Sequence, residues 1–127
     1  MTPEDRAGPD MSALLQRDYW LIRSTPMEST TAADVAHGAG EHVQWLLGLE
    51  ARGIVVMSGP LLSGPGVRPG AGITVVRADT EDDAVAIGNA DPFVLSGLRT
   101  FEVFRWRVNE GTIDVRISLG TGTFDLR

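Results

Sequence analysis

The chain contains no cysteine among its 127 residues. This excludes disulfides, a thiol nucleophile, iron–sulfur clusters and cysteine-ligated zinc. Basic residues are also few, 11 against 17 acidic residues, which gives a net charge of −6 at pH 7. Nucleic acids and anionic membranes both recruit Lys and Arg, so we expect neither as a partner of this acidic chain. No stretch approaches the roughly 18 uninterrupted apolar residues that a membrane-spanning helix needs.

The length and the apolar content are those of one small folded domain. Apolar residues make up 43% of the chain, enough for one packed core. We expect a flexible N-terminal extension over residues 1–17, because its first part combines Pro, Gly and acidic residues without an apolar segment. Residues 18–127 are expected to form the domain, with a core at 18–108 and a hairpin at 109–127. With no export signal and no cysteine, the expected compartment is the cytoplasm.

Several segments carry the patterns of regular secondary structure. Short apolar or alternating runs predict strands at residues 18–24, 54–58, 72–77 and 100–109, and a hairpin from 113–117 and 124–126. Spaced apolar stripes behind threonine caps predict helices at 31–52 and from Thr80 to about Asn89. Gly38 and Gly40 each cost about 1 kcal/mol in a helix interior. We therefore expect the first helix to break there, with its strong part at 41–51.

The order of these elements is strand–helix–strand twice, followed by the hairpin. Two such halves predict an α+β fold of the ferredoxin-like type, a split βαβ arrangement (βαββαβ) with an antiparallel sheet. Both helices would then cover one face of that sheet. Large apolar side chains alternate onto the other face, which therefore needs a cover. In so short a chain we expect a second subunit to supply this cover, so that the protein is a homodimer joined sheet to sheet.

The two histidines, His37 and His42, are five residues apart, so they do not share a face of a helix. No metal site is expected from this spacing. A lone histidine on a helix is ordinarily a surface residue or a hydrogen-bonded core residue, and the residues alone leave a functional role open. The same holds for Asp91, because Asp before Pro ordinarily begins a turn.

Two further segments have a plain structural interpretation beside a functional one. The Gly- and Pro-rich stretch 59–72 lacks the spacing of a nucleotide- or phosphate-binding loop, so we expect a structural connection, with a lid over a site as the alternative. On the last strand of the core, Arg105 and Arg107 alternate with Phe104 and Trp106, as they do in some RNA-binding sheets. The acidic chain favours a solvated or subunit-facing strand instead.

The order of several short motifs resembles that of the YCII-related (YciI-like) family over about residues 19–108. The motifs are His42, Trp45-Leu46-Leu47, Ser58-Gly59-Pro60-Leu61, Asp91-Pro92-Phe93, Ser96-Gly97-Leu98 and Val103–Trp106. The resemblance implies a ferredoxin-like fold that dimerises through its sheets. It also implies a His–Asp pair in a cleft, proposed as an acid–base site, at the positions of His42 and Asp91. Proteins related by fold include muconolactone isomerases and a dehydrochlorinase that acts on a hydroxylated ring.

A His–Asp pair can transfer protons, because imidazole titrates near neutrality and a carboxylate at one ring nitrogen fixes the tautomer. The first hypothesis is therefore a lyase or isomerase without metal or other cofactor, in which His42 is the base and Asp91 its orienting partner. Its substrate would be a small carbonyl or ring compound. The candidate substrate-binding residues are Arg23, Ser58, Pro92, Phe93 and Trp106. The alternative is a non-catalytic dimeric module that binds a small metabolite or a partner protein; a third reading, with less support, is a cofactor-free oxygenase.

Overall fold

The structure is a computed structural model that describes residues 8 and 10–127. Residues 18–107 form one compact unit, and the segments before Asp18 and after Arg107 belong to a second unit. The expectation of a flexible N-terminal extension at residues 1–17 falls in part outside the described part of the chain, on residues 1–7 and 9. Within that part, none of the helices combines the length and the apolar content needed to cross a membrane.

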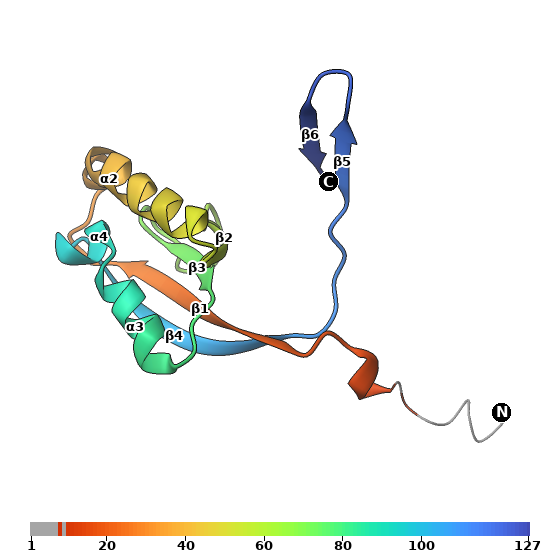
Figure 1. The fold of residues 1–127 in the computed structure, drawn as a ribbon. Helices are drawn as coiled ribbons and strands as arrows, with labels where there is room; N and C mark the ends of the chain where they lie inside the picture. The colour runs from red at the N-terminus through yellow and green to blue at the C-terminus, as the bar shows by residue number, and fades with distance from the viewer. Residues whose placement is uncertain (1–7, 9) are drawn as a thin grey trace. The chain divides into compact units, whose positions relative to one another are not determined.

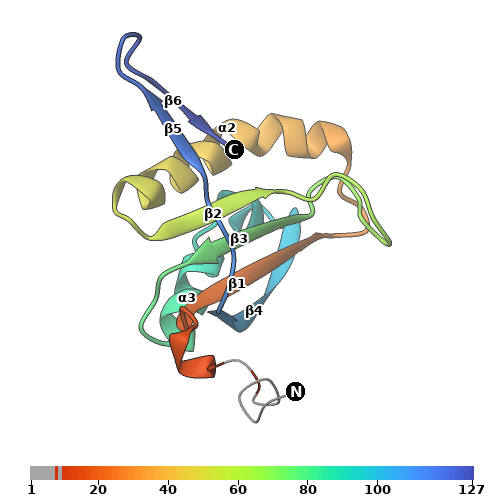
Figure 2. The same cartoon turned by 90° about the vertical axis from the view of Figure 1, so that its right-hand side faces the viewer.

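The larger unit is built on one four-stranded sheet with the strand order β2-β3-β1-β4. Both β1 and β2 pair antiparallel with β3, which therefore separates the two strands that the first long helix connects. This is the split βαβ arrangement, and it confirms the predicted ferredoxin-like α+β fold. The elements in chain order are β1 (Arg17–Pro26), α2 (Ala32–Ala51), β2 (Val55–Pro60), β3 (Gly72–Val76), α3 (Glu81–Asn89), α4 (Pro92–Leu95) and β4 (Arg99–Val108). Helices α2 and α3 lie on the same face of the sheet (Figures 1 and 2).

Both long helices begin where threonine caps predict. The Thr31 side chain accepts a hydrogen bond from the Asp34 amide at 3.1 Å, and the Asp34 carboxylate accepts one from the Thr31 amide at 2.9 Å. This capping box satisfies two amides that have no partner inside the helix. Thr80 caps α3 through its side chain, which accepts a hydrogen bond from the Asp83 amide at 3.1 Å.

Helix α2 runs unbroken from Ala32 to Ala51, so the predicted break at Gly38 and Gly40 is wrong. A Cβ atom added at Gly38 would lie 2.8 Å from Cε1 of Phe93, which is too close for an ordinary contact. The glycine therefore lets Phe93 of α4 approach the backbone of α2. That packing offsets the helix propensity lost at Gly38.

The two faces of β4 differ as the alternation predicts. Phe101 points to the helices, because a Cβ atom at Gly88 of α3 would lie 2.5 Å from its ring. Phe104 and Trp106 belong to the opposite face, and 42% and 45% of their surfaces are exposed. The core between sheet and helices includes the buried residues Ile22, Leu49, Val76, Ala84 and Phe93.

The second unit contains the short 3-10 helix η1 (Met11–Ala13) and a two-stranded antiparallel hairpin, β5 (Val115–Ser118) with β6 (Thr123–Leu126). The predicted hairpin is confirmed, although its first strand begins two residues later than the alternation suggests.

Candidate active site

The site is built around one pair of side chains that are 49 residues apart in the sequence. Nδ1 of His42, on α2, lies 2.8 Å from Oδ1 of Asp91. Both side chains are largely buried, with 13% of the His42 side chain exposed. Asp91 is also the N-cap of α4, because the same Oδ1 accepts a hydrogen bond from the Phe93 amide at 3.0 Å. The turn role and the histidine contact of Asp91 thus occur together.

Arg99 occupies the other oxygen of this carboxylate. Its Nε and Nη2 donate hydrogen bonds to Oδ2 of Asp91 at 3.0 and 2.7 Å. Its Nη1 donates a third, to the carbonyl of Gly70 at 3.2 Å. Sequence reasoning missed Arg99. The available signal was its place on β4, two residues before Phe101 and therefore on the face that turns toward the helices, where a charged side chain needs a partner.

These contacts keep Asp91 ionised. Burial raises the pKa of the Asp91 carboxyl, but three favourable contacts oppose this effect: the hydrogen bond from His42, the charge and hydrogen bonds of Arg99, and the amide of Phe93. Together they hold the pKa of Asp91 below its usual range. An ionised carboxylate can only accept hydrogen bonds, so the proton between the two side chains belongs to Nδ1 of His42. In the neutral ring, Nε2 is then the unprotonated nitrogen.

Aromatic contacts hold the imidazole ring in place. The Phe93 ring is stacked on His42, with the ring centroids 4.4 Å apart and an angle of 24° between the planes. The Trp45 ring lies 5.8 Å from the same imidazole. Cζ of Arg99 lies 5.0 Å from the centroid of Phe93. Phe93 therefore contacts both residues that bind Asp91, so its position bears on the orientation of the whole group.

His42 and Arg99 line a cavity of about 350 Å³ between α2 and the strands β2 and β3. Most of the wall is apolar side chain or glycine backbone, and the polar side chains on it are those of His42, Ser58, Thr74 and Arg99. The apolar lining consists of Val35, Ala39, Val43, Leu46, Pro60, Ala71, Ile73 and Phe93.

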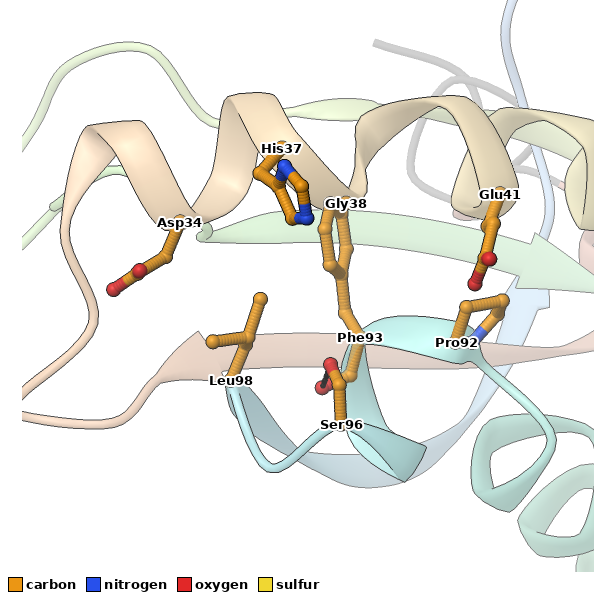
Figure 3. A pocket seen from close by; sticks show the side chains of 8 residues that line it. All are labelled: Asp34, His37, Gly38, Glu41, Pro92, Phe93, Ser96 and Leu98. Atoms are coloured by element: carbon orange, nitrogen blue, oxygen red, sulfur yellow. Dashed lines mark hydrogen bonds between the residues drawn. The ribbon is translucent and has the colours of Figure 1, made fainter.

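A second pocket, of about 340 Å³, shares Phe93 with the first. Figure 3 shows its lining: Asp34, His37, Gly38 and Glu41 from α2, with Pro92, Phe93, Ser96 and Leu98 facing them. The two histidines thus line different pockets. Within residues 8 and 10–127, no group of three or more His, Asp or Glu side chains is placed to hold a metal ion.

The structure brings some of the predicted binding residues to His42 and leaves others elsewhere. Ser58 and Phe93 line its cavity, whereas Pro92 lines the second pocket. Arg23 pairs with Glu102 at 3.1 Å, and its Cζ lies 5.1 Å from the centroid of the Phe104 ring. Neither Arg23 nor Trp106 lines the cavity that contains His42.

Comparison with known proteins places the chain in a family. The model of the YCII-related domain matches residues 19–107, which is more than half of the chain. The chain belongs to the YCII-related domain family. This YCII-related protein is 34% identical over 74 residues to the uncharacterized protein YjpA of Bacillus subtilis (strain 168). That alignment covers 58% of this chain and 80% of YjpA.

A solved structure shares the fold of the YCII-related protein. It is 5-chloro-2-hydroxyhydroquinone dehydrochlorinase from Burkholderia phenoliruptrix AC1100 in complex with 2,5-dihydroxybenzoquinone. The TM-score is 0.58 at 22% sequence identity, and the match covers 69% of this chain and 92% of that chain. At this identity the likeness shows the fold, and it agrees with the ferredoxin-like architecture described above.

Proposed function

We propose that this YCII-related protein is a cofactor-independent lyase or isomerase in which His42 moves a proton and Asp91 orients the imidazole. The observation that carries the proposal is the 2.8 Å contact between Nδ1 of His42 and Oδ1 of Asp91 at the wall of a cavity. Within the described residues, no group forms a hydrogen bond with Nε2 of His42, which leaves that nitrogen for a substrate.

The reaction follows from these side chains. Nε2 of His42 takes a proton from a carbon next to a carbonyl group, and the electron pair of the broken C–H bond forms an enolate. The imidazolium ion is stabilised by the Asp91 carboxylate at Nδ1. In an isomerisation, Nε2 returns the proton to a different carbon. In an elimination, the enolate expels a leaving group from the neighbouring carbon as an anion. The sequence has neither Lys nor Cys, so neither a lysine Schiff base nor a thiol nucleophile belongs to the mechanism.

The cavity favours a small substrate. Its volume of about 350 Å³ is at the lower end of the range for ligand pockets, and its apolar wall fits a compact carbonyl or ring compound. The dehydrochlorinase of similar fold has a hydroxylated ring compound in its name and a dihydroxybenzoquinone in its structure. This supports the choice of substrate class without naming the substrate of the present protein.

Proton exchange tests the proposal without a known substrate. The purified protein would be incubated in D₂O with a panel of small enolisable carbonyl compounds, and loss of the C–H signals would be followed by proton NMR. We expect catalysed exchange with at least one compound, slowed about 10²- to 10⁴-fold by His42→Gln. His37→Gln is the matched control, because His37 lies on the same helix but lines the other pocket. Exchange unaffected by His42→Gln would refute the proposal.

A non-catalytic binding module is the second candidate function. The observation that favours it is the structural role of Asp91, which caps α4 and pairs with Arg99. Such a module would bind small compounds in the cavity, seen as chemical-shift changes at His42, without exchanging their protons. Catalysed exchange that depends on His42 would exclude this candidate.

A homodimer is part of the proposal. Phe104 and Trp106 expose apolar surface on the sheet face opposite the helices, and a second copy of the chain would cover it. Light scattering should give twice the mass of one chain. Trp106→Glu should shift the protein toward monomer, whereas Leu95→Glu, at an exposed apolar position on α4, should not. A monomeric wild-type protein would contradict the dimer.

A further inference from the structure

Two hydroxyl groups face each other in the wall of the cavity that contains His42. Ser58 of β2 and Thr74 of β3 are direct partners in the register of the two strands. Their oxygens, Oγ of Ser58 and Oγ1 of Thr74, lie 2.9 Å apart. Both residues line the same cavity as His42, among apolar side chains and glycines.

The hydrogen-bonding capacity of this pair leaves one donor free. Each hydroxyl group has one hydrogen, and the contact between the two oxygens uses one of them. Within residues 8 and 10–127, neither hydroxyl forms any other hydrogen bond. Thr74 is buried and Ser58 is exposed, so an arrangement in which Thr74 donates to Ser58 leaves the Ser58 hydrogen directed to the accessible side. The cavity therefore offers one O–H donor in addition to the His42 imidazole, whose unprotonated Nε2 is an acceptor.

The charges around the cavity indicate what that donor binds. Arg99 is the charged side chain on the wall, and Asp91 neutralises it through two hydrogen bonds. No uncompensated positive charge remains among the lining residues to bind a carboxylate or a phosphate group. A charged ligand group placed there would lose its hydration without gaining a counter-ion. The lining therefore favours a neutral oxygen, such as that of a ketone, an aldehyde or an ester.

We propose that Ser58, positioned by Thr74, donates a hydrogen bond to the carbonyl oxygen of a small uncharged substrate while His42 removes the neighbouring proton. This inference rests on the function proposed above. As the C–H bond breaks, its electron pair forms the C=C bond, the carbonyl π electrons move to oxygen, and the proton goes to Nε2 of His42. The Ser58 hydroxyl stabilises the developing oxyanion. Ser58 is then a catalytic residue and Thr74 a positioning residue.

The test compares matched neutral and charged compounds and matched hydroxyl variants. Deuterium exchange is measured for pyruvate against methyl pyruvate and for levulinate against methyl levulinate, with background exchange without protein subtracted. We expect the wild-type protein to exchange the esters at least about tenfold faster than the acids relative to background. Ser58→Ala should slow exchange about 10²- to 10³-fold, the usual effect of removing one oxyanion donor.

Further variants separate a chemical role from a structural one. Ser58→Thr and Thr74→Ser keep the hydroxyl groups and should retain most of the exchange rate, whereas Thr74→Val should lose a large part of it. Thr25→Val, the same substitution at an exposed position of β1, is the control and should leave the rate unchanged. Circular dichroism of each variant reports whether the fold is kept.

The outcomes distinguish this inference from the function on which it rests. Exchange by the wild-type protein that Ser58→Ala leaves unchanged would overturn the role of the hydroxyl pair and leave the role of His42 standing. Faster exchange of the acids than of the esters would overturn the uncharged substrate class. No exchange of any compound by the wild-type protein would overturn the proposed function and this inference together.

Discussion

Arg99 holds one oxygen of the Asp91 carboxylate with two hydrogen bonds, at 3.0 and 2.7 Å, and leaves the other oxygen to His42. The carboxylate therefore cannot rotate without losing contacts on both sides. Its orientation determines where the Nδ1 hydrogen of His42 points, and with it the direction of Nε2. Arg99 thus acts on the His42 imidazole through the Asp91 carboxylate, which lies between the two side chains.

Replacing Arg99 should destabilise the protein strongly. Arg99→Met leaves the buried Asp91 carboxylate without its main cation, and the free energy of unfolding should fall by about 3–5 kcal/mol. Urea unfolding followed by tryptophan fluorescence measures the change. Arg23→Met is the matched control, because the pair of Arg23 with Glu102 is half exposed and should contribute at most about 1 kcal/mol. Equal effects of the two substitutions would contradict the buried ion pair as a stabilising contact.

The stability of the fold should depend on pH through Asp91. The pKa of Asp91 is held below its usual range in the folded protein, so its ionisation stabilises the fold above about pH 4, the pKa of an unfolded aspartate. This contribution is lost as the pH falls through the folded pKa. Asp91→Asn removes it, because an amide side chain does not ionise in this pH range.

Urea unfolding at a series of pH values checks this dependence. The difference in unfolding free energy between wild type and Asp91→Asn should be largest near neutral pH and should shrink as the medium is acidified. The variant should keep some dependence on pH, because Arg107 and Arg105 hold the pKa of Asp18 below its usual range as well. Parallel curves for the two proteins would show that Asp91 is not a stabilising carboxylate.

The helices and strands could be predicted from the sequence, because caps and side-chain alternation depend on residues only a few positions apart. Thr31 and Asp34 form a capping box within one helical turn, and alternation separates Phe101 from Phe104 on β4. The predicted pair of His42 and Asp91 depended instead on a resemblance to a family. No spacing rule connects residues 49 apart, since their contact requires α4 to pack against α2.

Arg99 and Gly38 show why the rest of the site could not be predicted. A charged residue at the start of a strand is ordinarily exposed, and only the tertiary structure places Arg99 against Asp91. Gly38 suggests a helix break from its propensity, whereas the structure uses its missing side chain to admit Phe93. In both cases the deciding contact lies between elements rather than within one.

Gly38 and Gly40 of α2 should therefore respond in opposite ways to alanine. At Gly38 the new methyl group would lie 2.8 Å from Phe93, so Gly38→Ala should cost about 1–3 kcal/mol of unfolding free energy and displace the ring that stacks on His42. At Gly40 nothing lies within 4 Å of an added Cβ, so Gly40→Ala should stabilise the helix by about 0.5–1 kcal/mol. Thermal unfolding measures both changes. Stabilisation by Gly38→Ala would contradict the close approach of α4.

The tautomer of His42 is the most direct readout of the site. The ionised Asp91 accepts the Nδ1 hydrogen, so the neutral ring should have its proton on Nδ1 and a free lone pair on Nε2. Nitrogen-15 chemical shifts of the imidazole, recorded at a pH where the ring is neutral, distinguish the two tautomers. Asp91→Ala should abolish the preference for Nδ1–H, and His37, identified by His37→Gln, serves as the internal reference. If the wild-type ring instead has its proton on Nε2, that nitrogen cannot act as the base, and His42 would have to be removed from the mechanism.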